Sequence, residues 1–362
     1  MSGGAVAAII GTRPEAIKMA PVLRALNRRG IGCTLLCTGQ HPQLDLQGAG
    51  MPMGPVVALG LDARGIDADA MCAAIEALAS DQLARTGPRL VLVQGDTNSA
   101  LAGARAAHRL GIAVGHVEAG LRTHDLSDPW PEERNRVEIA RIATLHFAPT
   151  TAARRALAAE RVGGTIIHSG NSGIDALLDT AADVGPVDRA GPPTIMVTVH
   201  RRENRGAGVA RIGCALRAIA AREDVRFVVP LHPNGQARGE MLTATEGLRG
   251  LTTTGPLTYR ATVELMLRSH LILTDSGGLQ EEAAALGRPL LILRNSTERP
   301  EVIESGNALL VGTDPERVAT ETLRLLRDAD AHARMSVPAF PFGEGGASGD
   351  ERGIAVQRAA DQ

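Results

Sequence analysis

Short apolar runs alternate with helical patterns along the N-terminal half of the chain, and each apolar run ends in a polar cluster. The apolar runs are 6–10, 35–37, 90–93 and 112–117, and the helical patterns between them include 70–83 and 99–110. This alternation of strands and helices predicts a parallel, doubly wound sheet. Since ligands bind outside the carboxyl ends of the strands in such sheets, the polar clusters at those ends are candidate site residues.

The alternation starts again in the C-terminal half, after a Pro- and Gly-rich connection at 183–193. The apolar runs there are 194–199, 227–230, 271–273 and 290–293. A chain of 362 residues is also too long for one ordinary core. We therefore predict an α/β protein of two facing, doubly wound Rossmann-like domains with the site in the cleft between them. The predicted parts are an N-terminal domain at 1–170, a C-terminal nucleotide-binding domain at 171–345, and a C-terminal helix or tail at 346–362 that could return to the N-terminal domain.

The stretch 274–282 predicts a strand end, a tight glycine turn and the start of a helix. Ser276 is expected to cap the helix, and Gly277 and Gly278 have no Cβ to keep an anion away from the backbone N–H groups. Glu282 lies one turn further on, where its carboxylate could accept the hydroxyls of a ribose. A nucleotide diphosphate fits this layout better than a lone phosphate, and the alternative is a capped helix with no ligand.

A second anion-binding candidate follows the first apolar run, where Arg13 and Lys18 lie around the end of the predicted strand. Lys18 is the only lysine among 38 basic residues, in a composition that suggests a GC-rich genome in which Arg has replaced Lys. A lysine kept at one position indicates a need for a compact ammonium, although chance survival is the alternative.

Three carboxylates, Asp96, Glu118 and Glu132, follow predicted strands in the first domain, and His200 follows one in the second. Such a set suits proton transfer, because burial and mutual repulsion can separate the pKa values of neighbouring acids. Arg136 shares a helix face with Glu132, and taken alone that pair is typical of a surface ion pair.

The composition excludes several classes of protein. A net charge of −2 argues against a nucleic-acid surface, and no run of 18 apolar residues exists to cross a membrane. The first residues lead into an apolar strand without a basic region or a cleavage site, so we expect a cytoplasmic protein. The ten histidines and four cysteines show no metal-ligand spacing, and no Gly-x-Gly-x-x-Gly fingerprint follows the first strand, so we expect neither a metal nor a cofactor.

Seven motifs together resemble the bacterial UDP-N-acetylglucosamine 2-epimerases and occur in the order typical of that family. They are Gly11-Thr12-Arg13-Pro14-Glu15, Gln94-Gly95-Asp96-Thr97, Gly115-His116-Val117-Glu118-Ala119-Gly120-Leu121-Arg122, Pro131-Glu132-Glu133, His200-Arg201-Arg202-Glu203, Thr274-Asp275-Ser276-Gly277-Gly278 and Thr297-Glu298-Arg299-Pro300-Glu301. The resemblance implies the two-domain fold of the B-type glycosyltransferases and a homodimer. It also implies interconversion of UDP-N-acetylglucosamine and UDP-N-acetylmannosamine without NAD or metal.

The resemblance also implies a role for each candidate residue. Asp96, Glu118 and Glu132 would be the acid and base carboxylates, and His200 would assist departure of the diphosphate. The groups expected to bind the rest of the UDP-sugar are Arg13, Lys18, Ser276, Gly277 and Gly278 at the diphosphate, Glu282 at the ribose, and Arg136 and Arg299 in the charged lining. A candidate allosteric site for a second UDP-sugar would comprise Gln40, His41, Gln43, Arg201 and His232.

Three alternatives stay open on the sequence. A hydrolysing epimerase would release UDP and free N-acetylmannosamine, and a B-type glycosyltransferase would use the same turn with an acceptor in the opposite domain. A nucleotide-sugar sensor would keep the fold and lose the chemistry. One departure concerns the base, because Thr262 stands where relatives carry an aromatic residue against the uracil, which leaves Tyr259 or Arg260 to hold it.

Overall fold

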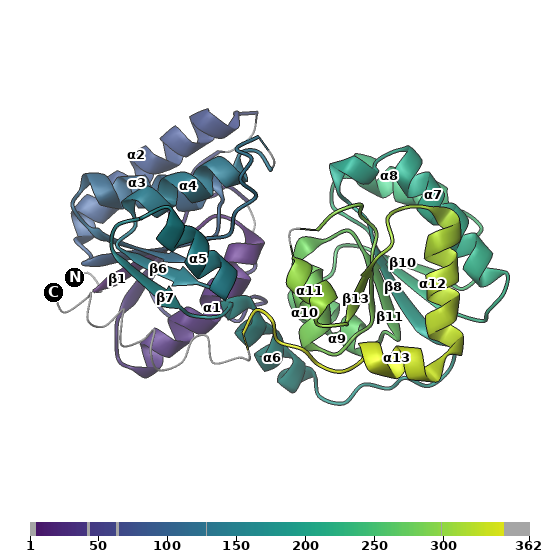
Figure 1. Cartoon of the computed structure of the whole chain (residues 1–362). Coiled ribbons are helices and arrows are strands. Elements are labelled where there is room, and N and C mark those ends of the chain that lie inside the picture. Colours follow the sequence, from purple (N-terminus) through teal and green to yellow (C-terminus); the bar gives the residue numbers. More distant parts are fainter. Residues whose placement is uncertain (1–4, 42–43, 63–64, 128, 298, 344–362) are drawn as a thin grey trace. The chain divides into compact units, whose positions relative to one another are not determined.

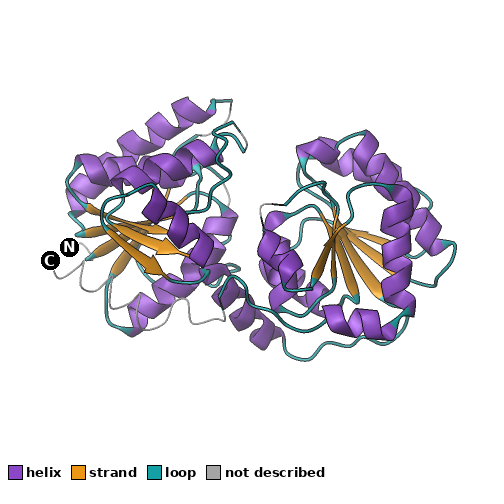
Figure 2. Ribbon diagram, viewed as in Figure 1, coloured by secondary structure: helices purple, strands orange, loops and turns teal. Residues whose placement is uncertain are grey.

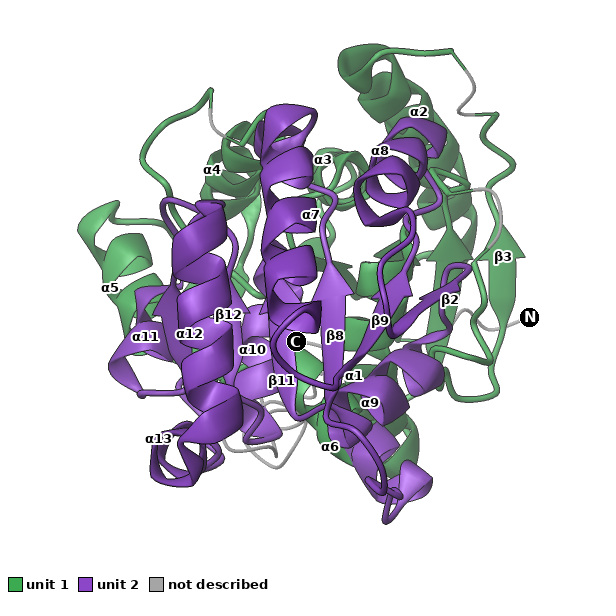
Figure 3. Ribbon diagram, turned by 90° about the vertical axis from the view of Figure 1, so that its right-hand side faces the viewer, with its two compact units in different colours: residues 1–178, 342–362 green, residues 179–341 purple. Residues whose placement is uncertain are grey.

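The computed structural model describes residues 5–41, 44–62, 65–127, 129–297 and 299–343. The chain divides into two compact units (Figure 3). Unit 1 contains residues 1–178 and takes in the C-terminal residues from Phe342 onward, and unit 2 contains Asp179–Pro341. Helices cover both faces of the sheet in each unit (Figure 2).

Unit 1 is built on a seven-stranded sheet with the order β3-β2-β1-β4-β5-β6-β7, and every strand pair in it is parallel. Its strands are β1 Val6–Ile10, β2 Cys33–Cys37, β3 Val56–Ala58, β4 Leu90–Gln94, β5 Ala113–Val117, β6 Leu145–Ala148 and β7 Thr165–His168. Its helices are α1 Arg13–Arg28, α2 Ala68–Thr86, α3 Asn98–Arg109, α4 Glu132–Ile142, α5 Thr151–Ala159 and α6 Ser172–Val184, of which α6 runs into unit 2 (Figure 1).

The central strand of unit 1 shows why the sheet needs helices on both faces. All five residues of β1 are buried. Because side chains alternate along a strand, Ala7 and Ile9 pack with α2 and α3 in one core cluster. Val6, Ala8 and Ile10 belong to a second cluster together with the buried face of α1. A continuous apolar run is therefore the expected signature of this strand, and that is what the sequence shows.

Unit 2 repeats the architecture with six parallel strands in the order β10-β9-β8-β11-β12-β13. Its strands are β8 Thr194–Thr198, β9 Arg226–Pro230, β10 Leu251–Thr254, β11 Leu271–Thr274, β12 Leu290–Ile292 and β13 Ala308–Leu310. Its helices are α7 Ala207–Ala220, α8 Gly235–Thr245, α9 Tyr259–Arg268, α10 Gly277–Ala285, α11 Pro300–Glu304, α12 Pro315–Arg327 and α13 Ala329–Met335, with a 3₁₀ turn at Arg202–Asn204. The apolar side chains of β8, α7 and α12 form its main core.

The strand order reverses between β1 and β4 in unit 1 and between β8 and β11 in unit 2. At such a reversal the connecting helices leave in opposite directions, which opens a crevice at the carboxyl ends of the two strands. Arg13 begins α1 after β1, Asp96 follows β4, His200 follows β8 and Ser276 follows β11. Both reversals therefore coincide with candidate residues.

The structural boundary falls between Leu178 and Asp179, whereas the sequence suggested 170/171. The glycine-rich stretch that marked the predicted boundary is the entry to α6, and the first six residues of that helix, Ser172 to Leu177, are buried. At the other end the chain comes back to unit 1, where Asn171 donates its backbone N–H to the carbonyl of Phe342 at 2.8 Å. The predicted tail at 346–362 lies outside the described residues.

Within the described ranges, no helix is both long and apolar enough to span a membrane. The same part of the chain contains no group of three or more His, Cys, Asp or Glu side chains arranged to hold a metal ion.

Candidate active site

Glu118 lies directly after β5 and is held from two sides. The ammonium of Lys18 contacts both carboxylate oxygens, at 2.8 and 2.6 Å, and the amide of Gln94 also donates to Oε2. The side chain of Glu118 is only 8% exposed. Its backbone φ is +66°, a left-handed conformation that costs a non-glycine residue about 1 kcal/mol. The single lysine of the chain therefore holds the carboxylate of Glu118, a residue with a strained backbone conformation at a strand end.

Asp96 follows β4 and is fixed by α4. Nη2 of Arg136 contacts its carboxylate at 2.5 Å, and Nη1 of the same guanidinium donates to Glu133 at 2.9 Å. Asn135 donates from its side chain to the backbone carbonyl of Asp96 at 2.9 Å. Burial opposes the charge on Arg136, yet the carboxylates of Asp96 and Glu133 raise the pKa of Arg136 above its ordinary value.

Glu132 begins α4, and its Oε2 is buried without a hydrogen-bond partner among the described residues. Arg136 pairs with Asp96 and Glu133 instead, so the surface ion pair that the spacing of Glu132 and Arg136 allowed is not formed. A buried carboxyl oxygen without a partner is uncommon in folded proteins, and a catalytic role is one explanation for it.

The loop after β1 is organised by Glu15. Its Oε2 accepts the backbone N–H groups of Gly11 and Thr12, at 2.9 and 2.7 Å, and its Oε1 accepts the hydroxyl of Thr97 at 2.6 Å. Burial raises the pKa of Glu15, and these hydrogen bonds oppose that rise. Arg13, the first residue of α1, is half-buried and makes no ion pair within the described part of the chain.

The residues proposed for a second ligand are divided between the two units. In unit 1 the carbonyl oxygen of Gln40 accepts the N–H and the hydroxyl of Ser99, at 3.1 and 2.7 Å, and burial lowers the pKa of His41. Gln43 lies outside the described residues. In unit 2 the ring of His232 stacks on that of His200 with centroids 5.2 Å apart.

Asp275 holds His200 in unit 2. Its carboxylate is fully buried and accepts the backbone N–H groups of His200 and Arg201, at 3.1 and 2.9 Å, and the side-chain amide of Asn204 at 3.0 Å. Nδ1 of His200 lies 3.5 Å from the same carboxylate. Burial lowers the pKa of His200, Asp275 acts to raise it, and the neighbouring His232 lowers it further.

The glycine turn after β11 starts α10 as predicted, with Ser276 at the N-cap position. The predicted cap is not made, however, because the side chain of Ser276 forms no capping hydrogen bond. The first-turn N–H groups are consequently not used by that hydroxyl. No heavy atom lies within 4 Å of the position that a Cβ on Gly278 would take. The turn therefore has the open helix N-terminus that an anion needs.

The ribose and uracil candidates lie on the helices that flank this turn. Glu282 accepts the hydroxyl of Tyr259 at 3.1 Å, and burial together with that carboxylate raises the pKa of Tyr259 well above 10. Arg299 pairs with Glu281 at 2.5 Å. Arg260 donates to the carbonyl of Asp183 at 2.9 Å.

Sequence reasoning gave no role to four residues that the structure places at these sites. Gln94, Glu133 and Asp275 each contact a candidate residue directly, and Glu15 holds the first loop. All four stand inside the motifs quoted above, but some of their partners are distant in the sequence, such as Thr97 for Glu15 and Glu118 for Gln94. Motif membership was the only signal for them in the sequence.

A family model described as UDP-N-acetylglucosamine 2-epimerase matches residues 24–351 of this chain. The chain belongs to that family. The UDP-N-acetylglucosamine 2-epimerase of Escherichia coli (strain K12) is 40% identical over 358 residues, which cover 94% of this chain and 95% of the E. coli protein. The family that the motifs predicted is thus confirmed.

Solved structures give the same result for the fold of this epimerase-family chain. The crystal structure of UDP-GlcNAc 2-epimerase from Neisseria meningitidis bound to UDP-GlcNAc is 34% identical, with a TM-score of 0.89 over 99% of this chain and 100% of that chain. The calicheamicin glycosyltransferase CalG4 is only 15% identical, with a TM-score of 0.62 over 100% and 99% of the two chains, and shows the fold alone. The predicted B-type glycosyltransferase fold is confirmed.

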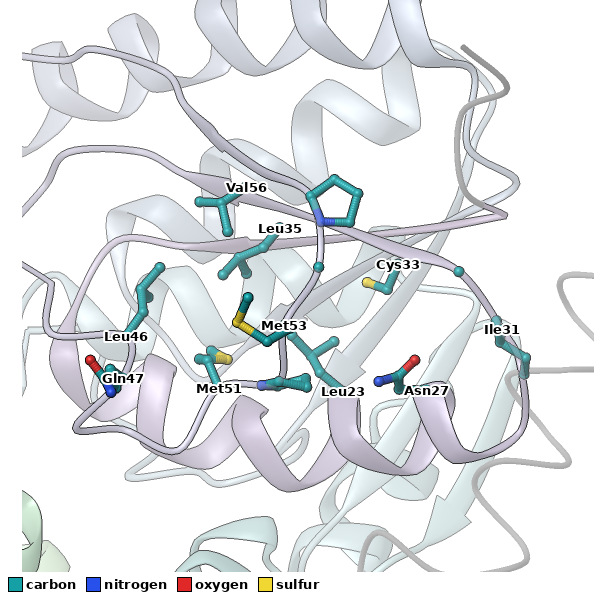
Figure 4. Close-up of a pocket in the computed structure, with 14 residues that line it drawn as sticks. Leu23, Asn27, Ile31, Cys33, Leu35, Leu46, Gln47, Met51, Met53 and Val56 are labelled. Carbon is teal, nitrogen blue, oxygen red and sulfur yellow. The ribbon is translucent and has the colours of Figure 1, made fainter.

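One pocket of about 460 Å³ lies away from this chemistry, at the start of β2 and β3 in unit 1 (Figure 4). Its lining is mostly apolar and includes Leu23, Leu35, Met51 and Met53. Burial raises the pKa of the Cys33 thiol in its wall to about 12. In doubly wound sheets ligands bind at the carboxyl ends of the strands, opposite to the strand starts, so we do not assign this pocket to the candidate active site.

Proposed function

We propose that this protein interconverts UDP-N-acetylglucosamine and UDP-N-acetylmannosamine. The observation that carries the proposal is that Asp96 follows β4 at the strand-order reversal of unit 1 and Glu118 follows the neighbouring strand β5, while His200 and the glycine turn follow the two strands at the reversal of unit 2. The name of the E. coli relative and the UDP-GlcNAc bound to the Neisseria protein support the same substrate.

The chemistry explains why such a site needs several carboxylates. The hydrogen at C2 of the sugar has no adjacent carbonyl to acidify it, so UDP leaves first or nearly first. Breaking the C1–O bond gives C1 oxocarbenium character, a carboxylate removes the C2 proton, and 2-acetamidoglucal forms beside UDP. Protonation of C2 on the opposite face and addition of UDP at C1 give the epimer.

We assign the proton transfers to unit 1. Asp96 and Glu118 are each paired with a cation, which suits a carboxylate that accepts a proton. Glu132 has a buried oxygen without a partner, which suits a carboxyl group that gives its proton to C2. Arg136 keeps Asp96 in place while these steps occur.

We assign the diphosphate to unit 2 and to the first loop. The uncapped start of α10 at Ser276, Gly277 and Gly278 would bind it, Arg13 would add charge, and His200 would assist its departure. Glu282 would accept the ribose hydroxyls. In this proposal both groups of residues act on one substrate.

We further propose the non-hydrolysing outcome, in which UDP is added back to the sugar. A second UDP-sugar bound by Gln40, His41, Gln43, Arg201 and His232 would activate it. Arg299 would complete the charged lining of the first site. A homodimer and a cytoplasmic location also stay predictions.

Incubation with UDP-N-acetylglucosamine and no acceptor separates this function from that of a glycosyltransferase. We expect a second nucleotide sugar to appear on anion-exchange chromatography at equal total uridine. A glycosyltransferase or a sensor would leave the substrate as the sole nucleotide sugar, and a hydrolysing enzyme would give UDP.

A further inference from the structure

Both carboxylate oxygens of Glu133, the neighbour of the candidate acid Glu132, accept hydrogen bonds. Its side chain is 1% exposed. Oε1 accepts the backbone N–H groups of Thr123 and His124, at 3.0 and 3.1 Å, and Oε2 accepts from Nη1 of Arg136 at 2.9 Å. One buried side chain therefore joins the loop after β5 to the guanidinium that holds Asp96.

The geometry of Arg136 makes this link directional. Its guanidinium is planar and presents its N–H groups in a fixed fork. With Nη1 held by Glu133, Nη2 points to Asp96, where the distance is 2.5 Å. Without Glu133 the fork could rotate and approach Asp96 in several orientations, so the position of that carboxylate would be less well defined.

The carboxylate of Glu133 also holds the backbone at Thr123 and His124, which precede Glu132 in the chain. His124 has a backbone φ of +64°, so the chain turns sharply where Glu133 binds it. Adjacent glutamates thus differ completely in environment, since Glu133 accepts three hydrogen bonds while Oε2 of Glu132 accepts none among the described residues.

We propose that Glu133 is a positioning residue for the epimerisation, and this inference rests on the proposed function. It sets the orientation of Asp96 through Arg136 and the position of Thr123 and His124 through two backbone hydrogen bonds. It makes no contact with the substrate itself. The first of these two effects governs turnover, and the second governs local order.

Two substitutions separate the effects. In Glu133→Gln the amide oxygen can still accept the N–H groups of Thr123 and His124, but its NH₂ group cannot accept from Arg136. We expect kcat to fall by about tenfold to a hundredfold with KM changed less than about threefold. Glu133→Ala also releases the loop, which should additionally increase acrylamide quenching of Trp130, the only tryptophan in the chain.

Glu138→Gln is the matched control, because Glu138 lies on the same helix and pairs with Arg105 at 2.5 Å on a different face. Its kcat should match that of the parent. A second control is a double-mutant cycle. If Glu133 acts through Arg136 on Asp96, the loss caused by Glu133→Gln should largely vanish in an Asp96→Asn background and persist in a Glu118→Gln background.

A parent-like kcat in Glu133→Gln would overturn the inference. So would equal losses in the Asp96→Asn and Glu118→Gln backgrounds, because a general structural effect would be additive with both. If the parent protein itself fails to make a second nucleotide sugar, the proposed function fails instead, so the two failures are distinguishable.

Discussion

The structure explains why Lys18 is retained, but it does not test the diphosphate contact expected of it. Its rarity in an arginine-rich chain singled it out, and the structure gives a physical reason for its retention. The ammonium lies between the two oxygens of Glu118, and the stem of the side chain packs near Gly173, with Cε 3.4 Å from where a Cβ on that glycine would lie. Contact with the diphosphate, the role that the resemblance implied, stays a prediction.

We predict that Lys18→Arg lowers kcat/KM by about tenfold or more even though the charge is kept. A planar guanidinium spreads its charge over a fork of N–H groups and cannot place one compact charge against both oxygens of Glu118 as the ammonium does. Steady-state kinetics measure the effect. Arg24→Lys is the control, because Arg24 lies on the same helix and binds the carbonyl of Gly50 at 2.5 Å. Parent-like kinetics for Lys18→Arg would mean that the lysine survives by chance.

Other residues show what sequence reasoning could not reach. Asp96, Glu118 and His200 are recognisable because they end predicted strands. Asp275 holds His200, and Glu133 acts on Asp96 through Arg136. Asp275 accepts the backbone N–H of His200 from 75 positions away, and Glu133 accepts that of Thr123 from 10 positions away. Hydrogen bonds of this kind depend on tertiary geometry that no local pattern encodes.

The elements themselves were largely predictable. Buried strands such as β1 and β4 are continuous apolar runs, because helices cover both faces. The edge strand β3 was not predicted, since it has three residues and its burial pattern is mostly exposed. The start of α6 was read as a domain boundary, because its glycine-rich entry resembles a linker.

A methyl group added at the first turn of α10 should leave protein stability intact but weaken UDP binding. We predict that Gly278→Ala weakens UDP binding by about tenfold or more, because the new methyl would occupy space that the diphosphate needs. Thermal stability should be unchanged or higher, since Ala forms helices better than Gly by up to about 1 kcal/mol. Isothermal titration calorimetry and thermal unfolding measure the two effects.

Gly239→Ala is the matched control for this experiment. Gly239 lies inside α8, and a Cβ there would also meet no heavy atom within 4 Å. The control should gain similar stability and keep full UDP affinity. Equal affinity in the two variants would show that the turn after β11 does not hold the diphosphate.

His116 on β5 should make the free energy of unfolding depend on pH. Its ring is fully buried, and Nε2 lies 2.7 Å from the carbonyl of Gly95, which can only accept, so this nitrogen bears the proton. Burial lowers its pKa from 6.5 to about 4. As the pH falls from 6.5 towards 4, His116 is protonated in the unfolded chain but not in the folded protein. The free energy of unfolding therefore decreases in that pH range.

We expect His116→Gln, which keeps a donor to Gly95, to lose about 3 kcal/mol less than the parent between pH 6.5 and pH 4. Urea unfolding at several pH values measures the difference. Parallel losses in the parent and the variant would show that the ring is protonated within the folded protein.

At the scale of the whole molecule, two parallel sheets of similar topology each carry part of the proposed site. Unit 1 has the cation-paired carboxylates, and unit 2 has His200 and the uncapped start of α10, where we propose that the diphosphate binds. The sequence predicted two such domains because the alternation of strands and helices occurs twice. Only the motifs indicated which catalytic or binding roles belong to each domain. We expect that neither unit turns over substrate by itself.

The central claim is that UDP leaves and returns while the C2 proton is exchanged with solvent. Proton NMR of a reaction with UDP-N-acetylglucosamine in D₂O tests this most directly. We predict that UDP-N-acetylmannosamine accumulates and that the C2 proton signals of both nucleotide sugars are replaced by deuterium, with no free sugar. A C2 proton retained in the UDP-N-acetylmannosamine formed would contradict the account, and stoichiometric free N-acetylmannosamine with UDP would contradict the return of UDP.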